Sequence, residues 1–263
     1  MLKILLSRLR QGRRTNGYPK EAPALPLRFR GLPRLSSEHC LSKCRACEAA
    51  CPTGAISKSQ TIIDKSGKPQ LTLDLGMCLF CSACMESCPE QSIAFTRDHR
   101  LTARERDHLL LSHENPLVPA APLDGDLHKA FSKSLSVCIV SAGGCNGCEA
   151  ESNILQTITW DMMRFGIDFA ASPRHADALL ISGPITQNMR LALQKTIDAA
   201  PDPKLIIALG ACAISGGIYS SLPQQCNGCE GAGLKPDLLV PGCPPHPLTI
   251  LDGLLRLMGR VRG

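Results

Sequence analysis

The stretch CLFCSACMESCP, residues 78–89, indicates the fold of the first half of this chain. It spaces four cysteines as C-x2-C-x2-C-x3-C-P. A second run, CLSKCRACEAACP at residues 40–52, repeats the pattern with one additional residue between its first two cysteines. Cysteines at this spacing hold iron–sulfur clusters, and the last cysteine of each run ligates the cluster of the other run. The paired runs therefore predict that the chain carries electrons.

Paired runs of this kind are typical of two-cluster bacterial ferredoxins, so we expect two [4Fe–4S] clusters in this region. The expected ligands are Cys40, Cys44, Cys47 and Cys88 for the first cluster, and Cys51, Cys78, Cys81 and Cys84 for the second. The repeated units CPTGAIS (51–57) and CPEQSIA (88–94) support this exchange of the fourth ligand. Zinc ribbons are the alternative, but they use two CxxC pairs and lack the Cys-Pro ends.

Length and cysteine content narrow the class of protein. At 263 residues the chain is long enough for two domains, each with its own core. The 15 cysteines exceed what packing requires, and disulfides suit small secreted domains. We expect no hydrophobic signal peptide, and the apolar run over the first nine residues is too short and too charged to span a bilayer. We therefore expect thiolates that serve as metal ligands in a reducing compartment.

The formal net charge of +6 is uneven, because residues 1–35 contain nine basic side chains against a single acid, Glu21. The basic residues are Lys3, Arg8, Arg10, Arg13, Arg14, Lys20, Arg28, Arg30 and Arg34. Three interpretations remain open: an amphipathic helix on an anionic membrane, an arm docked on a partner protein, and an organelle transit peptide. Nucleic acid is not expected as a partner, because the aromatic content of 3% offers no stacking platform.

The composition divides the chain into four segments. We expect a basic amphipathic arm at 1–36, a ferredoxin domain at 37–97, a helix and linker at 98–130, and a second domain at 131–263. The polar stretch at 98–115 predicts a helix that ends before Pro116, and the Pro/Ala/Asp/Gly-rich segment after it is typical of a domain boundary.

The second domain alternates short apolar runs with helical patterns. The expected strands are 135–141, 177–183, 204–210 and 237–242, and the expected helices are 149–165, 188–200 and 247–258. Strands that alternate with helices in this way predict a parallel sheet covered by helices on both faces. The fold class is therefore α/β, with a ferredoxin fold followed by a flavodoxin-like, doubly wound domain.

Four further cysteines follow the strands of this second domain. Cys145 and Cys148 come after the first strand, Cys212 after the third and Cys243 after the fourth, with glycines beside each turn. Because the carboxyl ends of parallel strands meet at one edge of the sheet, we expect these four thiols to hold a third [4Fe–4S] cluster. The alternative is that they are unrelated core cysteines.

Three cysteines remain outside the predicted sites. Cys138 lies inside a strand and is expected to be a buried core thiol. Cys226 and Cys229 form a second CNGC in a glycine-rich loop, where free thiols or an oxidisable pair are favoured over a metal site completed by a histidine or a partner. Glu149 follows Cys148 and could assist proton traffic, although a first-turn helix acid is the favoured interpretation.

The first half resembles the two-cluster ferredoxin subunit shared by formate hydrogenlyase-type hydrogenases and respiratory complex I. Besides both cysteine runs, the resemblance rests on GRRTNGYP (12–19), FRGLP (29–33) and LGMCLFC (75–81). The second half resembles the small subunit of group 4 membrane-bound [NiFe] hydrogenases, which is related to the cluster-bearing subunit of complex I next to the quinone site. The residues that carry it are GGCNGCE (143–149), SPRHADALLISGPIT (172–186), APDPKLIIALGAC (200–212), SGGI (215–218) and PGCPP (241–245).

The resemblance implies an oxidoreductase subunit that passes electrons through three [4Fe–4S] clusters to a nickel–iron large subunit for reduction of protons to H2, with no catalytic residue of its own. It implies membrane-arm subunits, an upstream donor (ferredoxin, formate dehydrogenase or CO dehydrogenase module), and a peripheral place on the cytoplasmic face of the inner membrane. The alternative is an iron–sulfur subunit of a complex I-like quinone oxidoreductase. The complex I protein places its first two cluster cysteines side by side, whereas Asn146 and Gly147 separate them here.

Overall fold

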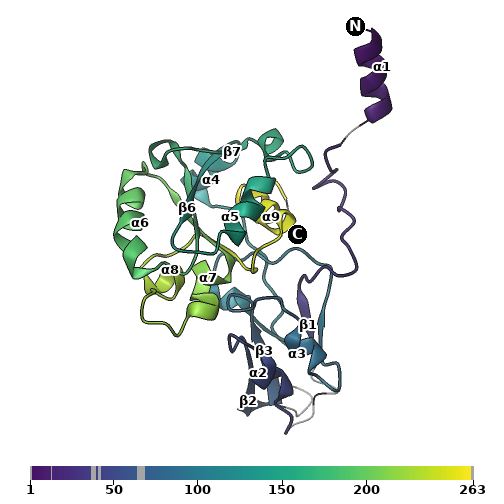
Figure 1. Cartoon of the computed structure of the whole chain (residues 1–263), viewed down its shortest axis with the longest axis vertical. Coiled ribbons are helices and arrows are strands. Elements are labelled where there is room, and N and C mark those ends of the chain that lie inside the picture. The colour runs from purple at the N-terminus through teal and green to yellow at the C-terminus, as the bar shows by residue number, and fades with distance from the viewer. Residues whose placement is uncertain (1, 13, 37–39, 41–42, 64–68, 262–263) are drawn as a thin grey trace.

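The computed structural model describes residues 2–12, 14–36, 40, 43–63 and 69–261 (Figure 1). The segment that contains the two cysteine runs forms one end of the body, and the five-stranded sheet with its helices forms the other. Helix α1 (Leu2–Gln11) stands away from both, and none of its residues is buried. Within the described residues, no helix combines the length and apolarity needed to cross a membrane.

The second half contains a five-stranded sheet in which every neighbouring pair is parallel. Its strands are β6 (Leu135–Ser141), β7 (Ile167–Phe169), β8 (Ala178–Ser182), β9 (Leu205–Leu209) and β10 (Leu238–Val240). Their order in the sheet, β10-β9-β8-β6-β7, is the flavodoxin-like order, so the predicted fold class is confirmed. The edge strand β7 was not predicted, because it has only three residues and Asp168 interrupts its apolar pattern.

Alternate residues of the central strands pack on opposite faces of this sheet. Val137 and Leu180 belong to one core with helix α9, while Cys138 and Ile181 belong to the other. The helices of this half are α4 (Gly125–Phe131), α5 (Gly147–Ile154), α6 (Gln187–Ala199), α7 (Gly210–Ser215), α8 (Gly228–Gly231) and α9 (Pro247–Leu257). Helix α9 is buried along its whole length.

One predicted helix is shorter than expected. The helix expected over 149–165 ends at Ile154, and a separate 3-10 helix covers Met162–Phe165. The β-branched residues Thr157, Ile158 and Thr159 disfavour a continuous helix there. In addition, the Thr157 hydroxyl donates to the Ile154 carbonyl (2.7 Å), so it satisfies a carbonyl that the helix leaves free.

Two small antiparallel sheets build the first half. Strand β1 (Pro33–Leu35) pairs with β4 (Ile93–Phe95), and β3 (Pro69–Asp74) lies between β2 (Ile56–Ile63) and β5 (Leu110–Ser112). Two short helices, α2 (Ala46–Ala50) and α3 (Ala83–Glu86), each lie within one cysteine run. Each run therefore contains one short helix, as the repeated sequence suggests.

The helix predicted over residues 98–115 is wrong. This segment contains a 3-10 helix at Arg106–Leu109 followed by strand β5, and Ala103 exchanges two backbone hydrogen bonds with Leu239 (3.1 and 2.8 Å). Tertiary pairing overrides helix propensity here. Because Ala103 belongs to the first half and Leu239 to β10, this pairing joins the two halves of the chain.

The segment after Pro116, which we expected to be a linker, lies against the body. Ala120 donates its N–H to the Thr102 carbonyl (2.8 Å), and Leu123 donates to that of Leu257 (2.9 Å). Both side chains are buried. One core contains Leu73 of β3 together with Ile181 of β8, so the two halves pack as a continuous structure.

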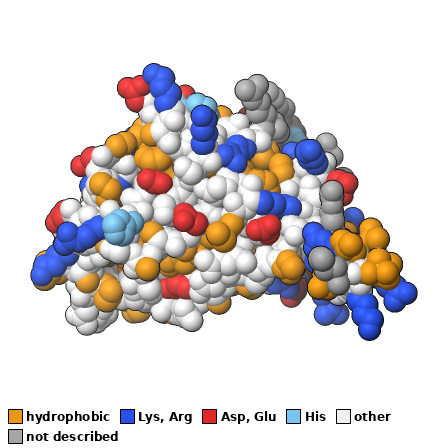
Figure 2. Space-filling view, turned by 90° about the horizontal axis from the view of Figure 1, so that it is seen from above, with side chains coloured by type: hydrophobic (Ala, Val, Ile, Leu, Met, Phe, Trp, Pro, Cys, Tyr) orange, Lys and Arg blue, Asp and Glu red, His pale blue; other side chains and the backbone are white. Residues whose placement is uncertain are grey.

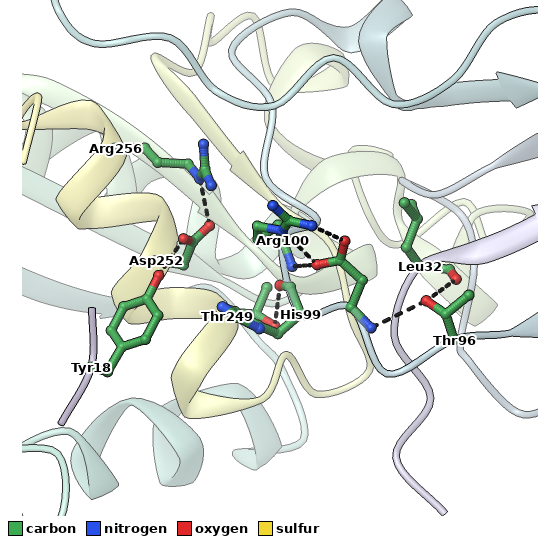
Figure 3. A network of polar contacts seen from close by, with 9 residues as sticks. Tyr18, Leu32, Thr96, His99, Arg100, Thr249, Asp252 and Arg256 are labelled. Carbon is green, nitrogen blue, oxygen red and sulfur yellow. Dashed lines mark hydrogen bonds and ion pairs between the residues drawn. The ribbon is translucent and has the colours of Figure 1, made fainter. Parts of the chain in front are cut away.

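The segment that follows α1 is held against helix α9 by a buried polar network (Figure 3). The Tyr18 hydroxyl donates to Asp252 Oδ1 (2.5 Å), and Asp252 Oδ2 accepts from Arg256 Nε (2.7 Å). All three side chains are buried, and burial together with the adjacent Asp252 carboxylate raises the pKa of Tyr18. The network therefore anchors the GRRTNGYP motif near α9.

We predict that Tyr18→Phe lowers the free energy of unfolding by about 1.5–3 kcal/mol, because the buried Asp252 carboxylate loses the hydrogen bond that the Tyr18 hydroxyl donates to it. Denaturant unfolding checks this value. The control is Tyr219→Phe, since the Tyr219 hydroxyl has no hydrogen bond to any described residue. Equal stability of the two variants would contradict the prediction.

Candidate iron–sulfur cluster sites

The two cysteine runs surround two hollows in the first half. One hollow is lined by Cys40, Cys44, Cys47 and Cys88, and the other by Cys51, Cys78, Cys81 and Cys84. The fold therefore brings the last cysteine of each run to the other three of its partner run. Among the described residues, no three His, Cys, Asp or Glu side chains are placed to hold a single metal ion. The thiols of each group instead surround a space, as the corners of an iron–sulfur cube require.

Backbone N–H groups point at sulfur in equivalent positions of the two runs. Ala55 donates to Cys51 Sγ (3.2 Å), and Ser92 donates to Cys88 Sγ (3.3 Å), each from four residues further along the chain. Phe80 donates to Cys78 Sγ (3.3 Å). Hydrogen bonds of this kind stabilise a thiolate and tune the potential of a bound cluster. The residues present therefore fit iron–sulfur clusters.

A third group of cysteines lies at the carboxyl ends of the parallel strands. Cys145 and Cys148 follow β6, the strand at which the order of the sheet reverses, since β7 lies on one side of it and β8 on the other. Cys212 lies in α7 directly after β9, and Cys243 follows β10. The Cys148 thiol interacts electrostatically with the other three thiols, so the fold brings together the four residues expected to hold a third cluster.

Gly210 allows the close approach of two of these cysteines. Its backbone has a φ of +86°, a left-handed conformation that favours glycine, at the turn from β9 into α7. A Cβ atom at this position would lie 2.6 Å from Cys148 Sγ. The glycine therefore keeps the turn that carries Cys212 next to Cys148, as the sequence pattern suggested.

Burial makes the thiolate form of these cysteines costly. Burial, followed by the charges of neighbouring thiols, raises the pKa of Cys78 and Cys148 to about 12 and that of Cys84 and Cys212 to about 11. Thiolates crowded in this way need a positive partner, and iron supplies it by replacing the protons. The electrostatics of the site therefore match a group whose ligands release protons when it binds.

Glu149 is anchored beside the third group. Ser182 Oγ donates to Glu149 Oε1 (2.7 Å), and the carboxyl is buried. Burial alone would raise its pKa, but hydrogen bonds from Ser141 and Ser182 hold the pKa below its usual value. An ionised, anchored carboxylate favours a structural role at the start of α5 over proton traffic. Sequence reasoning missed both serines, since each lies in a strand without any motif.

The three remaining cysteines lie outside these groups. Cys138 is buried in β6, as expected. Cys226 and Cys229 are also buried, and burial followed by the Glu230 charge raises the pKa of Cys229 to about 12. The two CNGC motifs share a left-handed asparagine before a helix, Asn146 in the first and Asn227 in the second, but only the second has a left-handed glycine, Gly228. The cysteines of the second CNGC do not belong to any of the three groups of four.

Two families of known proteins match this chain. Residues 145–257 match the family described as NADH ubiquinone oxidoreductase, 20 Kd subunit, and residues 39–92 match the family described as 4Fe-4S dicluster domain. The chain is 40% identical to formate hydrogenlyase subunit 7 of Escherichia coli, over 53% of this chain and 54% of that protein. The match thus spans about half the length of that relative.

Two further relatives are covered over most of their length. The chain is 39% identical to the "Probable membrane-bound hydrogenase subunit mbhJ" of Pyrococcus furiosus, over 49% of this chain and 77% of that protein. It is 36% identical to an NADH-quinone oxidoreductase subunit of Geotalea daltonii, over 56% of this chain and 86% of that protein. The chain therefore belongs to the family of the 20-kDa subunit of NADH ubiquinone oxidoreductase, joined here to a 4Fe-4S dicluster domain.

Proposed function

We propose that this chain is the electron-transfer subunit of a membrane-bound, energy-converting [NiFe] hydrogenase complex. In this proposal the three cysteine groups hold three [4Fe–4S] clusters, which supply one-electron transfer when bound. The observation that carries the proposal is the continuity of the groups: the Cys243 thiol of the third interacts electrostatically with Cys81 of the second. Two of the proposed sites are thus neighbours across the two halves of the chain.

The chain itself would hold, bury and space the clusters, and it would contribute no catalytic residue. We propose segments 37–97 and 131–263 as the two functional units, with 98–130 joining them. The Ala103–Leu239 pairing and the shared core support a fixed relation between the units. An electron could then cross between them without domain movement.

The proposed acceptor is a nickel–iron centre in a separate large subunit, where protons are reduced to H2. The CNGC spacing at Cys145 and Cys148 supports it, as do the relatives named as hydrogenase and formate hydrogenlyase subunits. Ferredoxin, or a formate dehydrogenase or CO dehydrogenase module, would supply the electrons. A complex I-like quinone oxidoreductase is the second candidate, favoured by the relative from the NADH-quinone oxidoreductase of Geotalea daltonii.

Helix α1 supports a peripheral position on the cytoplasmic face of the inner membrane, beside membrane-arm subunits. Its exposed apolar side chains are Leu2, Ile4, Leu5, Leu6 and Leu9, and it carries basic but no acidic residues. Figure 2 shows apolar and basic side chains gathered at the edge of the molecule where Figure 1 places α1. Such a helix is typical of an interfacial anchor on anionic lipid.

The two CNGC motifs provide a matched test of the proposed ligands. We predict that Cys148→Ala lowers the iron content of the anaerobically purified protein by about four atoms per chain, because one cube loses a ligand. Cys229→Ala, in the second CNGC, should retain the full content. The iron content of both variants, measured against the unmodified protein, checks this. Equal losses in the two variants would contradict the ligand assignment.

Hydrogen evolution distinguishes the two candidate acceptors. For the complex purified without oxygen through a tag on this chain, we expect H2 from reduced methyl viologen and nickel that co-purifies with the chain. Iron should exceed about twelve atoms per chain, since three cubes supply that number before any active site. Iron near twelve without nickel or H2 would instead indicate the quinone-type complex.

We predict that Leu5→Glu combined with Leu9→Glu releases the complex from membranes, because both side chains are exposed on α1 and acidic groups are repelled by anionic lipid. Sedimentation of the complex with membranes measures this. The control is Leu27→Glu, since Leu27 is 88% exposed but lies outside α1. Membrane association that survives the double substitution would argue against α1 as the anchor.

A further inference from the structure

A hydrogen bond between a serine side chain and a backbone carbonyl joins the loop before Cys78 to the helix that carries Cys212. The Ser215 hydroxyl, at the end of α7, donates to the Gly76 carbonyl (2.9 Å). Gly76 precedes Cys78 by two residues, and Ser215 follows Cys212 by three. This contact therefore lies between one ligand of the proposed second cluster and one ligand of the proposed third.

The contact is so close that only glycine fits on the ferredoxin side. A Cβ atom on Gly76 would lie 2.7 Å from Ile214 Cγ2 and 3.0 Å from the guanidinium carbon of Arg106. Ile214 is 2% exposed and belongs to the core shared by the two halves. A methyl group at Gly76 would therefore push the loop and α7 apart, unless both neighbours could move.

Arg106 cannot move easily, because it is paired with Asp74. Arg106 Nη1 donates to Asp74 Oδ1 (2.7 Å), and the same carboxyl oxygen accepts the N–H of Gly76 (2.8 Å). The arginine, the aspartate and the glycine backbone thus form a rigid corner directly before Cys78. The shared core therefore holds Ile214 in place, and the Asp74–Arg106 pair holds the loop of Gly76.

A pocket also lies where the two halves meet. A cavity of about 120 Å³ lies between the two halves, and its lining includes Phe29, Arg30, Phe80, Pro244, Pro245 and His246. The rings of Phe29 and His246, which line this pocket, pack edge-on with their centroids 5.2 Å apart, and Ala103 pairs with Leu239 elsewhere between the halves. The contact at Gly76 differs from these because it lies beside Cys78 and Cys212, which are proposed ligands of the second and third clusters.

We infer that Gly76 and Ser215 are positioning residues that set the distance between the second and third cluster sites, and thereby the rate of electron transfer between them. The inference rests on the proposed function, in which an electron crosses this junction. The probability of electron tunnelling falls exponentially with distance, so a small displacement at this contact would slow the transfer several-fold.

The test uses Gly76→Ala in the anaerobically purified complex. With both clusters reduced and paramagnetic, we expect the magnetic coupling between them in electron paramagnetic resonance spectra to weaken, while the iron content remains that of the unmodified complex. Rapid-freeze kinetics should show several-fold slower electron arrival at the third cluster. The control is Gly125→Ala: its left-handed φ of +56° strains an alanine, but no atom lies within 4 Å of the added methyl group, so it reports general strain without a clash between the halves.

Two companion variants keep the inference testable. Adding Ile214→Ala to Gly76→Ala makes room for the methyl group, so coupling and rate should recover. Failure to recover would mean that the alanine acts elsewhere and would overturn the inference. If Gly76→Ala does not assemble, Ser215→Ala decides instead, because it removes the hydrogen bond without adding bulk, and unchanged coupling would overturn the inference.

The same measurements separate this inference from the proposed function. Unchanged coupling and rate in Gly76→Ala, at full iron content, would overturn the inference and leave the electron-transfer function intact. Iron near eight atoms per chain in the unmodified protein, which is the content of two cubes, would instead remove the third cluster and with it the proposed function.

Discussion

The crowding of buried thiols is the constraint on which the rest of this structure depends. Burial raises the pKa of Cys78 and Cys148 to about 12, so neither would be a thiolate without a positive partner. The fold nevertheless gathers the cysteines in three groups and directs backbone N–H groups at the sulfurs of Cys51 and Cys88. In the proposed function, iron would replace the protons of these thiols and offset the cost of burying thiolates. The loops, short helices and glycines of both halves serve this arrangement.

A second requirement is that the two halves of the chain keep a fixed position relative to each other. Regular elements do little of this, because the connecting segment 98–130 contains only a 3-10 helix, the three-residue strand β5 and most of the short helix α4. The structure instead uses backbone pairing between Ala103 and Leu239, a shared core, and the contact of Gly76 with α7. Tyr18 adds a hydrogen bond to Asp252 that holds the start of the chain to α9. The chain that joins the halves is therefore part of the packing.

The fold class was predictable because its signals are local. Apolar runs that alternate with helical patterns indicated the parallel sheet, and the paired cysteine runs indicated the dicluster domain, which the family match confirms. The prediction was wrong at 98–115, where the polar residues had suggested a helix. Pairing of Ala103 with β10 and burial of Leu109 and Leu111 determine the structure there, and both depend on residues far away in sequence.

The sequence by itself determined which cysteines share a spacing pattern and indicated the dicluster domain, because ligand spacing within a loop is a local property. It also distinguished the two CNGC motifs by counting, since three leftover cysteines cannot complete a set of four. Only the tertiary structure decided that Cys243 lies near Cys81, that serines hold Glu149, and that Gly76 packs against Ile214. These contacts join segments distant in sequence, and such proximity arises only when the two halves pack together.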